Sequence, residues 1–381
     1  MVHYYRMTRN TKRVLVSGAS FAGLSTAYWM HALGYEVTVV ETSSALRTGG
    51  TAVNLEGNTV DIASRMGILE AIRADCLSLE TWEFKNGDDV TERTMVQRQK
   101  GEPPPEDAFE VERNTLLRLL FDLVKGDVEF VFDESVVSLR ETKSEVEVGF
   151  RSGPPRSFDL VLGCDGFRSN VRRLWFGPDS DYTHFLEQYF SITIVDRSLV
   201  EPNTAQMYNV PGKAVMLNAY KDKTDIVLCF VAEKEISYDH RDEGEQRRIV
   251  SEQFTGQGWR TAELLEEIRR SKSFYFDKLC QVRMPCWSKG RVALVGDAAY
   301  CASPAAGRGG SLALDGAAAL AEALQLHPES YEQAFRAYEE SFRPFIEHVQ
   351  ADAVRFGLEA LVPRTEEAIR KRNSAEGAGF G

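Results

Sequence analysis

Several familiar sequence features are missing from this chain of 381 residues. It has no run of about 18 apolar residues, so we expect no membrane-spanning helix. The N-terminal segment MVHYYRMTRNTKR has no apolar core, so we expect no signal peptide and a cytoplasmic protein. Met7 offers an alternative start, which would make residues 1–6 a disordered extension. The six cysteines form no C-x-x-C pair and H-E-x-x-H is absent, which argues against a disulfide framework and a metal site.

The chain also lacks an excess of basic charge, since 57 acidic residues outnumber 45 basic ones and the formal net charge is −12. An acidic surface argues against nucleic acid and anionic membranes as partners. The hydrophobic content of 43% is enough for a large core, and the length suggests two domains. We expect a monomer that acts on a small molecule.

The N-terminal segment VLVSGASFAGLSTAYWMHALGYEVTVVE predicts a strand, a tight loop, a helix and a second strand. Gly18, Ser20 and Gly23 occupy the three glycine positions of G-x-G-x-x-G, and Glu41 follows at roughly the 20-residue spacing of a dinucleotide fingerprint. Gly18 permits the turn, and Gly23 lets helix and strand approach closely. The helix N-terminus then offers N–H groups to a pyrophosphate, and Glu41 offers a carboxylate to a ribose. Ser20 departs from the usual middle glycine.

Two rival motifs fail in this segment at the residue that carries their chemistry. A phosphate-binding P-loop would need lysine where Leu24 stands, and a G-x-S-x-G hydrolase would need glycine where Ala22 stands.

Two later strands also run into an aspartate and a glycine. Residues 160–162 lead to Asp165, and residues 292–295 lead to Asp297. The second loop is rich in alanine, proline and glycine before a helix that we expect at residues 311–324. Either loop alone is ordinary turn chemistry.

Together, the three ordered motifs resemble the class A, para-hydroxybenzoate hydroxylase-like, FAD-dependent monooxygenases over residues 12–325. Within that class, GASFAGLSTAYWM, GGTAVNL and GRGGSLAL are similar to the flavin-dependent tetracycline destructases. The resemblance implies an α/β (α+β) fold. A Rossmann-like FAD-binding domain would be interleaved with an antiparallel-sheet substrate domain and followed by C-terminal helices.

The resemblance also assigns residues to the cofactors. Asp297 is expected at the ribityl or pyrophosphate region of non-covalently bound FAD, and the loop after it along the isoalloxazine edge. Backbone N–H groups there, and the helix dipole behind them, would stabilise reduced flavin. Asp165 and Arg172 are expected near FAD and NADPH, which binds transiently. The full set of expected cofactor contacts is Gly18, Ser20, Gly23, Glu41, Arg47, Gly49, Arg113, Asp165, Arg172, Asp297, Pro304, Gly307, Gly309, Gly310 and Ser311, the last standing where the family often has asparagine.

The substrate half is less informative. Short strands joined by turns are expected in residues 181–277, with a hairpin through Asn86-Gly87. The candidate pocket residues are Thr193, Gln206, Met216 and Phe230. The expected FAD-binding domain comprises residues 1–80, 97–180 and 278–326, the substrate domain residues 81–96 and 181–277, the C-terminal helices residues 327–372 and a disordered tail residues 373–381.

The C-terminal pattern predicts a long helix from Ser330, interrupted near Pro344, and then a second helix. Phe335, Tyr338, Phe342 and Phe345 give it an apolar stripe, which indicates core packing and could also cover a substrate.

The resemblance implies that NADPH reduces FAD and that O2 then forms a flavin C4a-hydroperoxide, which oxygenates and inactivates a tetracycline. The flavin does the chemistry, so no protein nucleophile or base is assigned. One alternative is a tailoring hydroxylase of another aromatic polyketide or a phenol. Others are a flavoprotein fold reused as a binding module, which intact Asp297 disfavours, and a dehydrogenase, which the lack of a second nucleotide-binding unit disfavours.

Overall fold

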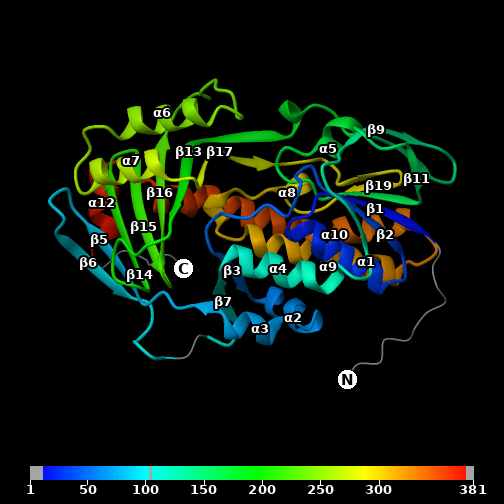
Figure 1. Ribbon diagram of the computed structural model, residues 1–381, viewed down its shortest axis with the longest axis horizontal. Helices are drawn as coiled ribbons and strands as arrows, with labels where there is room; N and C mark the ends of the chain where they lie inside the picture. Colours follow the sequence, from blue (N-terminus) through cyan, green and yellow to red (C-terminus); the bar gives the residue numbers. More distant parts are fainter. Residues whose placement is uncertain (1–11, 103–104, 375–381) are drawn as a thin grey trace.

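The computed structural model describes residues 12–102 and 105–374 (Figure 1). The expectations for residues 1–6 and for the tail at 375–381 lie outside these ranges. The two tail residues that are described, Asn373 and Ser374, do not fit a disordered tail. Asn373 ends helix α12 (Glu366–Asn373), and its side-chain amide donates to Glu92 over 3.0 Å.

One lobe is built on a six-stranded sheet, seen on the right of Figure 1. β1 pairs in parallel with β2 and β12, and the inner residues of β1 are fully buried. Such strands need helices on both faces, since both faces are buried. The strand order is β18 (Ser288–Lys289), β19 (Val292–Leu294), β12 (Leu160–Gly163), β1 (Arg13–Ser17), β2 (Glu36–Val40) and β8 (Glu129–Val131).

The helices of this parallel-sheet lobe include α1 (Phe21–Ala32), α4 (Arg113–Val124) and α9 (Gly309–Leu326). The helix expected at 311–324 is confirmed and is slightly longer. Smaller elements complete the lobe: β3 (Val53–Glu56), β4 (Cys76–Leu77), β7 (Ala108–Val111), β9 (Val136–Glu141), β10 (Val146–Phe150), β11 (Arg156–Phe158), α2 (Asn58–Arg65), α3 (Leu69–Ala74), α5 (Asn170–Trp175), η1 (Asp179–Asp181), α8 (Asp297–Tyr300) and η2 (Pro304–Ala306).

The other lobe is a seven-stranded sheet in which only the β14–β5 pair is parallel. Helices α6 (Glu243–Phe254) and α7 (Thr261–Arg270) lie over it in Figure 1. The predicted hairpin through Asn86-Gly87 is confirmed by the antiparallel pairing of β5 and β6. The strand order is β17 (Phe274–Val282), β13 (Thr183–Val195), β16 (Lys223–Val231), β15 (Lys213–Tyr220), β14 (Thr204–Val210), β5 (Thr81–Lys85) and β6 (Thr91–Val96).

The two faces of this antiparallel sheet meet different partners. Tyr189, Leu217 and Phe230 point to one face and pack with buried side chains of α6 and α7. Their neighbours along the strands, Phe190 and Cys229, point to the other face. That second face meets the C-terminal helices and the loop at η2, because side chains alternate along a strand.

The C-terminal helix was predicted wrongly at Pro344. Helix α10 (Tyr331–Asp352) continues through this proline and changes to a π-helical turn only at Ala353–Gly357. Pro344 and Glu340, whose carbonyl loses its helical donor, are both exposed, so water can satisfy that carbonyl. The stripe is core packing except at Phe345, which is 37% exposed.

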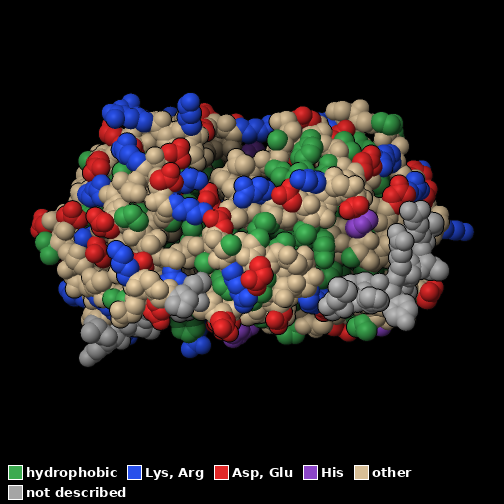
Figure 2. Space-filling view, turned by 60° about the horizontal axis from the view of Figure 1, so that its bottom comes forward, with side chains coloured by type: hydrophobic (Ala, Val, Ile, Leu, Met, Phe, Trp, Pro, Cys, Tyr) green, Lys and Arg blue, Asp and Glu red, His purple; other side chains and the backbone are tan. Residues whose placement is uncertain are grey.

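Beyond the π-helical turn, α11 (Leu358–Leu361) leads the chain over the antiparallel sheet. Gly357 sits so close to η2 that a Cβ there would lie 2.3 Å from the carbonyl oxygen of Ala305. No helix within the described ranges is long and apolar enough to cross a membrane. On the face shown in Figure 2, acidic and basic side chains are interspersed, and hydrophobic side chains gather near the middle.

Candidate cofactor and substrate site

The turn between β1 and α1 is held by two glycines that no other residue could replace. Gly18 has φ +104°, and a Cβ there would lie 2.5 Å from the carbonyl oxygen of Cys164. A Cβ on Gly23 would lie 1.8 Å from the carbonyl oxygen of Gly18. Ser20 precedes α1 but does not cap it; its hydroxyl accepts from Arg113 Nη2 over 3.2 Å. The first N–H groups of α1 are therefore free to bind an anion.

Glu41 lies buried beside this turn and holds it together. Its Oε2 accepts from the Ala19 backbone over 2.9 Å, and its Oε1 accepts from the Ser43 backbone over 3.0 Å. Burial alone would raise the pKa of Glu41, but the hydrogen bonds from Ala19 and Ser43 and the charge of Arg47 lower it below its usual value. Glu41, which directly follows β2, is thus ionised. Its carboxylate stabilises the turn between β1 and α1.

Arg113 reaches the same turn from the start of α4. Its guanidinium carbon lies 4.6 Å from the centre of the Phe21 ring, and a Cβ on Gly50 would lie 2.7 Å from its Cδ. Desolvation lowers the pKa of Arg113, and the charge of Asp297 opposes that shift. Gly49 donates its N–H to Asn114 Oδ1 over 2.9 Å. The Arg47 side chain is 68% exposed, with Nε 3.8 Å from Glu41 Oε1.

Asp297 begins the short helix α8, directly after strand β19 and the turn at Gly296. Gly296, with φ +69°, lies against α1, since a Cβ there would be 2.8 Å from Ala22 Cβ. Asp297 is accessible to solvent, yet protein atoms crowd it on several sides. This desolvation raises its pKa, while Arg113 and Arg172 oppose the shift. A carboxylate so placed can accept hydrogen bonds from a polyol or diphosphate linker.

The loop after Asp297 exposes bare backbone. Gly307 has φ +67° and is exposed, and nothing lies within 4 Å of a Cβ built on Gly309. Gly310 is tight against β3, where a Cβ would lie 3.2 Å from Val53 Cβ. The Ser311 hydroxyl donates to the Asn54 carbonyl over 2.8 Å, so it ties α9 to β3. A flat ring can therefore approach the backbone at Gly307 and Gly309, beside exposed Pro304.

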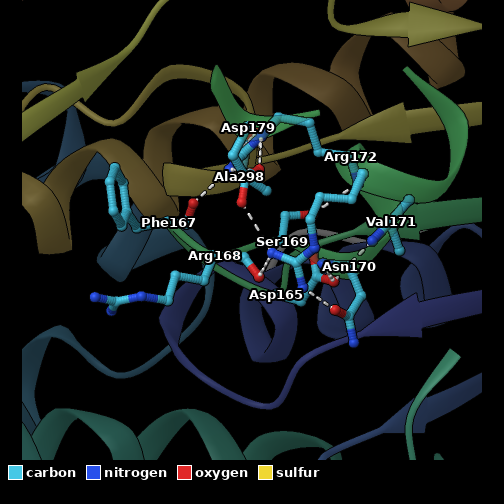
Figure 3. A network of polar contacts seen from close by, with 10 residues as sticks. Asp165, Phe167, Arg168, Ser169, Asn170, Val171, Arg172, Asp179 and Ala298 are labelled. Carbon is cyan, nitrogen blue, oxygen red and sulfur yellow. Dashed lines mark hydrogen bonds and ion pairs between the residues drawn. The ribbon is translucent and has the colours of Figure 1, made fainter. Parts of the chain in front are cut away.

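Asp165 and Arg172 play structural parts (Figure 3). Asp165 accepts from the Ser169 hydroxyl over 2.5 Å and from the Asn170 backbone over 2.8 Å, at the start of α5. Arg172 is completely buried and donates to Asp179 over 2.7 Å and to the Ala298 carbonyl over 2.8 Å. Because no guanidinium surface remains, the expected direct contact of Arg172 with NADPH must be corrected to a positioning role for the loop that carries Asp297.

A polar cluster near Arg113 was not predicted from the sequence. Arg168 donates two hydrogen bonds to Asp277, over 2.7 and 2.9 Å, and the Tyr275 hydroxyl donates to the same carboxylate over 2.9 Å. Tyr275 lies close enough to Arg113 to affect its pKa. The cluster joins the loop after β12 to strand β17, and no local motif around Tyr275 or Asp277 announces it.

A cavity of about 540 Å³ lies between the two lobes. Pro304 and Asn54 place one part of it beside the glycine-rich loop, and the second face of the antiparallel sheet forms the opposite wall. Its lining comprises Thr51, Ala52, Asn54, Leu77, Leu79, Trp82, Gln97, Arg98, Pro105, Ala108, Phe109, Glu110, Phe190, Ile192, Met216, Asn218, Asp225, Val227, Cys229, Leu279, Pro304 and Leu361.

Of the four predicted pocket residues, only Met216 lines this cavity. Phe230 is buried in the core under α6 and α7. Thr193 follows Ile192, which lines the cavity, so alternation turns Thr193 to the other face. Gln206 pairs in register with Leu217 on that other face, and it donates to Glu83 over 2.8 Å. These three predictions were wrong because the register that assigns the faces is not visible in the sequence.

Comparison with known proteins gives three consistent results. Residues 11–353 match the model of the FAD binding domain family. An uncharacterized protein of Mycobacterium tuberculosis is 36% identical over 345 residues, 89% of this chain and 92% of the relative. A flavin-dependent monooxygenase from an unknown prokaryotic organism is 33% identical over 370 residues, 96% of this chain and 95% of the relative.

Solved structures agree with these relatives. The crystal structure of tetracycline destructase Tet(51) superposes with a TM-score of 0.84 at 34% identity and covers 95% of each chain. A Klebsiella pneumoniae HpxO structure with FAD and uric acid, at 19% identity and a TM-score of 0.76, covers 96% of this chain and 92% of its own and shares the fold.

Proposed function

The chain belongs to the FAD binding domain family and is a flavin-dependent monooxygenase, and from this premise we propose that it uses NADPH and O2 to hydroxylate and inactivate tetracycline antibiotics. The observation that carries the proposal is the cavity that begins beside Pro304, next to the exposed backbone of Gly307 and Gly309. The full-length likeness to a tetracycline destructase supports the substrate.

The residues around the β1–α1 turn and the glycine-rich loop fit FAD. The N–H groups at the start of α1 suit its pyrophosphate, and Glu41, which holds the β1–α1 turn, would support the binding of its ribose. Asp297 suits the ribityl chain, and Gly307 and Gly309 leave room for the edge of the ring. Gly18 and Gly23 keep the turn open, because a Cβ at either position would collide with the backbone.

When bound, FAD would accept a hydride from NADPH and activate O2 for transfer of one oxygen atom. The chain's own residues would bind, orient and exclude water. The start of α9 would lend its positive dipole end to the negative charge of reduced flavin. Arg113 would supply a half-buried positive charge, and Arg172 fixes the carbonyl of Ala298 next to Asp297.

The substrate would enter between the lobes and lie on the second face of the antiparallel sheet. Apolar side chains such as Phe190, Met216 and Val227 give this wall the character that a polycyclic ligand needs. The C-terminal helices close over it at Leu361. An enolised β-diketone in this cavity would lie against a mainly apolar wall close to the flavin edge.

The deciding experiment is NADPH oxidation by the purified, FAD-loaded protein, followed with and without tetracycline. We expect tetracycline to accelerate oxidation and its visible absorbance to collapse. An unchanged drug with slow, unstimulated oxidation would contradict the substrate. A panel of phenols and aromatic polyketides would then test whether the protein is a tailoring hydroxylase with another substrate.

A further inference from the structure

One wall of the substrate cavity carries a buried carboxyl group with half of its bonding capacity unused. Asp225, near the start of β16, has no exposed surface and lines the cavity. Its Oδ1 accepts from the Tyr220 hydroxyl over 2.8 Å. Its Oδ2 has no hydrogen-bond partner among residues 12–102 and 105–374. Buried polar atoms normally have partners, so an orphan oxygen at a binding cavity points to a ligand.

A second carboxyl group faces the same space from the other lobe. Glu110 lies on β7, opposite Asn54 in the β3–β7 ladder, and both line the cavity. Within the described part of the chain, no hydrogen bond or ion pair engages its carboxylate. Burial raises the pKa of Glu110. Burial also raises the pKa of Asp225 to about 7, and the charge of Glu110 adds to that shift. The two groups therefore lie within electrostatic reach of each other.

Two lysines near this pair are already engaged, and a third cation, Arg98, lines the same cavity. Lys223 Nζ lies 2.6 Å from Glu112 Oε1, and Lys221 Nζ lies 2.7 Å from Asp75 Oδ1. These ion pairs fasten the β15–β16 hairpin to the parallel-sheet lobe, which brings Asp225 up to β7. Both ammonium groups are thus paired with other carboxylates, and the charge of Lys223 only partly opposes the upward shift in the pKa of Asp225.

We propose that Asp225 and Glu110 together form a subsite for a protonated amino group of the substrate. The proposal deepens the proposed function, since it needs a substrate in this cavity. An ammonium group brings the donors that Asp225 Oδ2 and Glu110 lack, and its charge balances theirs. The aromatic rings of Trp82 and Phe109 in the same lining suit an organic cation. The subsite would fix which end of the substrate faces Pro304 and the flavin.

The test uses the full-length, FAD-loaded protein and a matched pair of probes, 2-naphthylmethylamine and 2-naphthalenemethanol. They differ in the ammonium group and share the ring system. In calorimetric titration at about pH 8, we expect the amine to bind at least roughly ten-fold more tightly than the alcohol. This is the difference expected for one desolvated charge pair. Asp225→Asn should abolish most of this preference and Glu110→Gln should reduce it.

The matched control is Asp222→Asn, which removes one carboxylate from the exposed turn of the same hairpin without touching the cavity. It should keep the preference. Equal binding of the two probes by the unmodified protein would overturn the subsite, and so would a preference that survives in both Asp225→Asn and Glu110→Gln. Since Glu110 is only half-buried on a short strand, its variant stays informative if Asp225→Asn folds poorly.

The dependence on pH gives a second readout. The groups that act on Asp225 are Tyr220 on β15, Lys223 on β16, and Glu110 and Glu112 on the parallel-sheet lobe, and Arg98 lines the same cavity. The amine stays protonated below about pH 9. Its affinity should therefore fall as pH drops from about 8 to 6, as Asp225 takes up a proton, and this slope should flatten in Asp225→Asn. An equally steep slope in that variant would contradict the assignment.

Failure of the proposed function can be told apart from failure of the subsite. If tetracycline neither binds nor stimulates NADPH oxidation while the naphthyl amine keeps its preference, the substrate is wrong and the subsite stands. If tetracycline is oxidised and its analogue without the dimethylamino group binds equally well, the function stands and the subsite fails.

Discussion

Glu41 in the parallel-sheet lobe and Asp225 in the antiparallel-sheet lobe are both buried carboxyl groups, yet their pKa values shift in opposite directions. Burial pushes both upward. Two backbone N–H groups, a hydroxyl and an arginine reverse the shift at Glu41. Asp225 has a single donor, the Tyr220 hydroxyl, so burial prevails there. The number of donors, not the depth of burial, decides the sign.

This difference teaches how each lobe uses a carboxyl group. At Glu41 the chain supplies the partners, so the negative charge is permanent and part of the fold. At Asp225 the described part of the chain donates only to Oδ1, and Oδ2 stays available to a ligand in the cavity. A satisfied group stabilises the protein, whereas an unsatisfied one costs stability in exchange for binding.

The largest effect is expected on removing the satisfied charge. Glu41→Gln keeps the shape but turns an NH2 group toward backbone donors, so we expect about 2–3 kcal/mol lower free energy of unfolding near pH 7. FAD affinity should fall as the β1–α1 turn loosens. Urea unfolding and flavin-fluorescence titration measure the two losses.

The matched control is Glu36→Gln, on the exposed start of the same strand, which should change neither quantity. Since the pKa of Glu41 is lowered in the folded protein, its contribution is present above the unfolded value near 4.5 and is lost as pH falls through the folded value. The deficit of Glu41→Gln should therefore shrink toward pH 3. A deficit that is the same at both pH values would show that charge is not the cause.

Asp225→Asn should behave in the opposite sense. Its folded pKa, raised to about 7 from 3.8, means that the native state holds a proton the unfolded chain releases, so stability declines as pH rises between those values. Asparagine escapes this loss. Relative to the unmodified protein, we expect the variant to gain roughly 2 kcal/mol of unfolding free energy between about pH 5 and pH 8. Urea unfolding at the two pH values tests it, and a gain equal to that of Asp222→Asn would refute it.

The sequence allowed the cofactor side to be predicted because its parts are local. The spacing within one strand–helix–strand unit identifies Gly18, Gly23 and Glu41. The exposed backbone of the late loop follows directly from its glycines, Gly307 and Gly309. What each charged side chain contacts was less accessible. Arg172 belongs to a motif that predicted a contact with NADPH. Only the folded structure shows that its guanidinium binds Ala298 and Asp179 instead.

The substrate side resisted prediction for a physical reason. Seven of the nine residues of β16 are buried, so no apolar and polar alternation marks which face holds the cavity. Asp225 lies three residues after Asp222 of the turn, within β16, and no local motif distinguishes it from an ordinary strand residue. The pairing of Met216 with Val227 and of Val227 with Ile192 assigns the face, and that register comes only from the fold.

The smallest expected effect tests that assignment of faces. Thr193 is fully buried on the face away from the cavity, and its hydroxyl has no partner among the described residues. Thr193→Val should therefore leave the substrate affinity of the FAD-loaded protein unchanged and raise the free energy of unfolding by at most about 1 kcal/mol. Met216→Ala, on the cavity face, should weaken substrate binding several-fold. Because the two positions differ mainly in the side of one sheet on which they lie, loss of substrate affinity in Thr193→Val with retention in Met216→Ala would reverse the faces. The orphan oxygen of Asp225 would then have to be explained without a ligand.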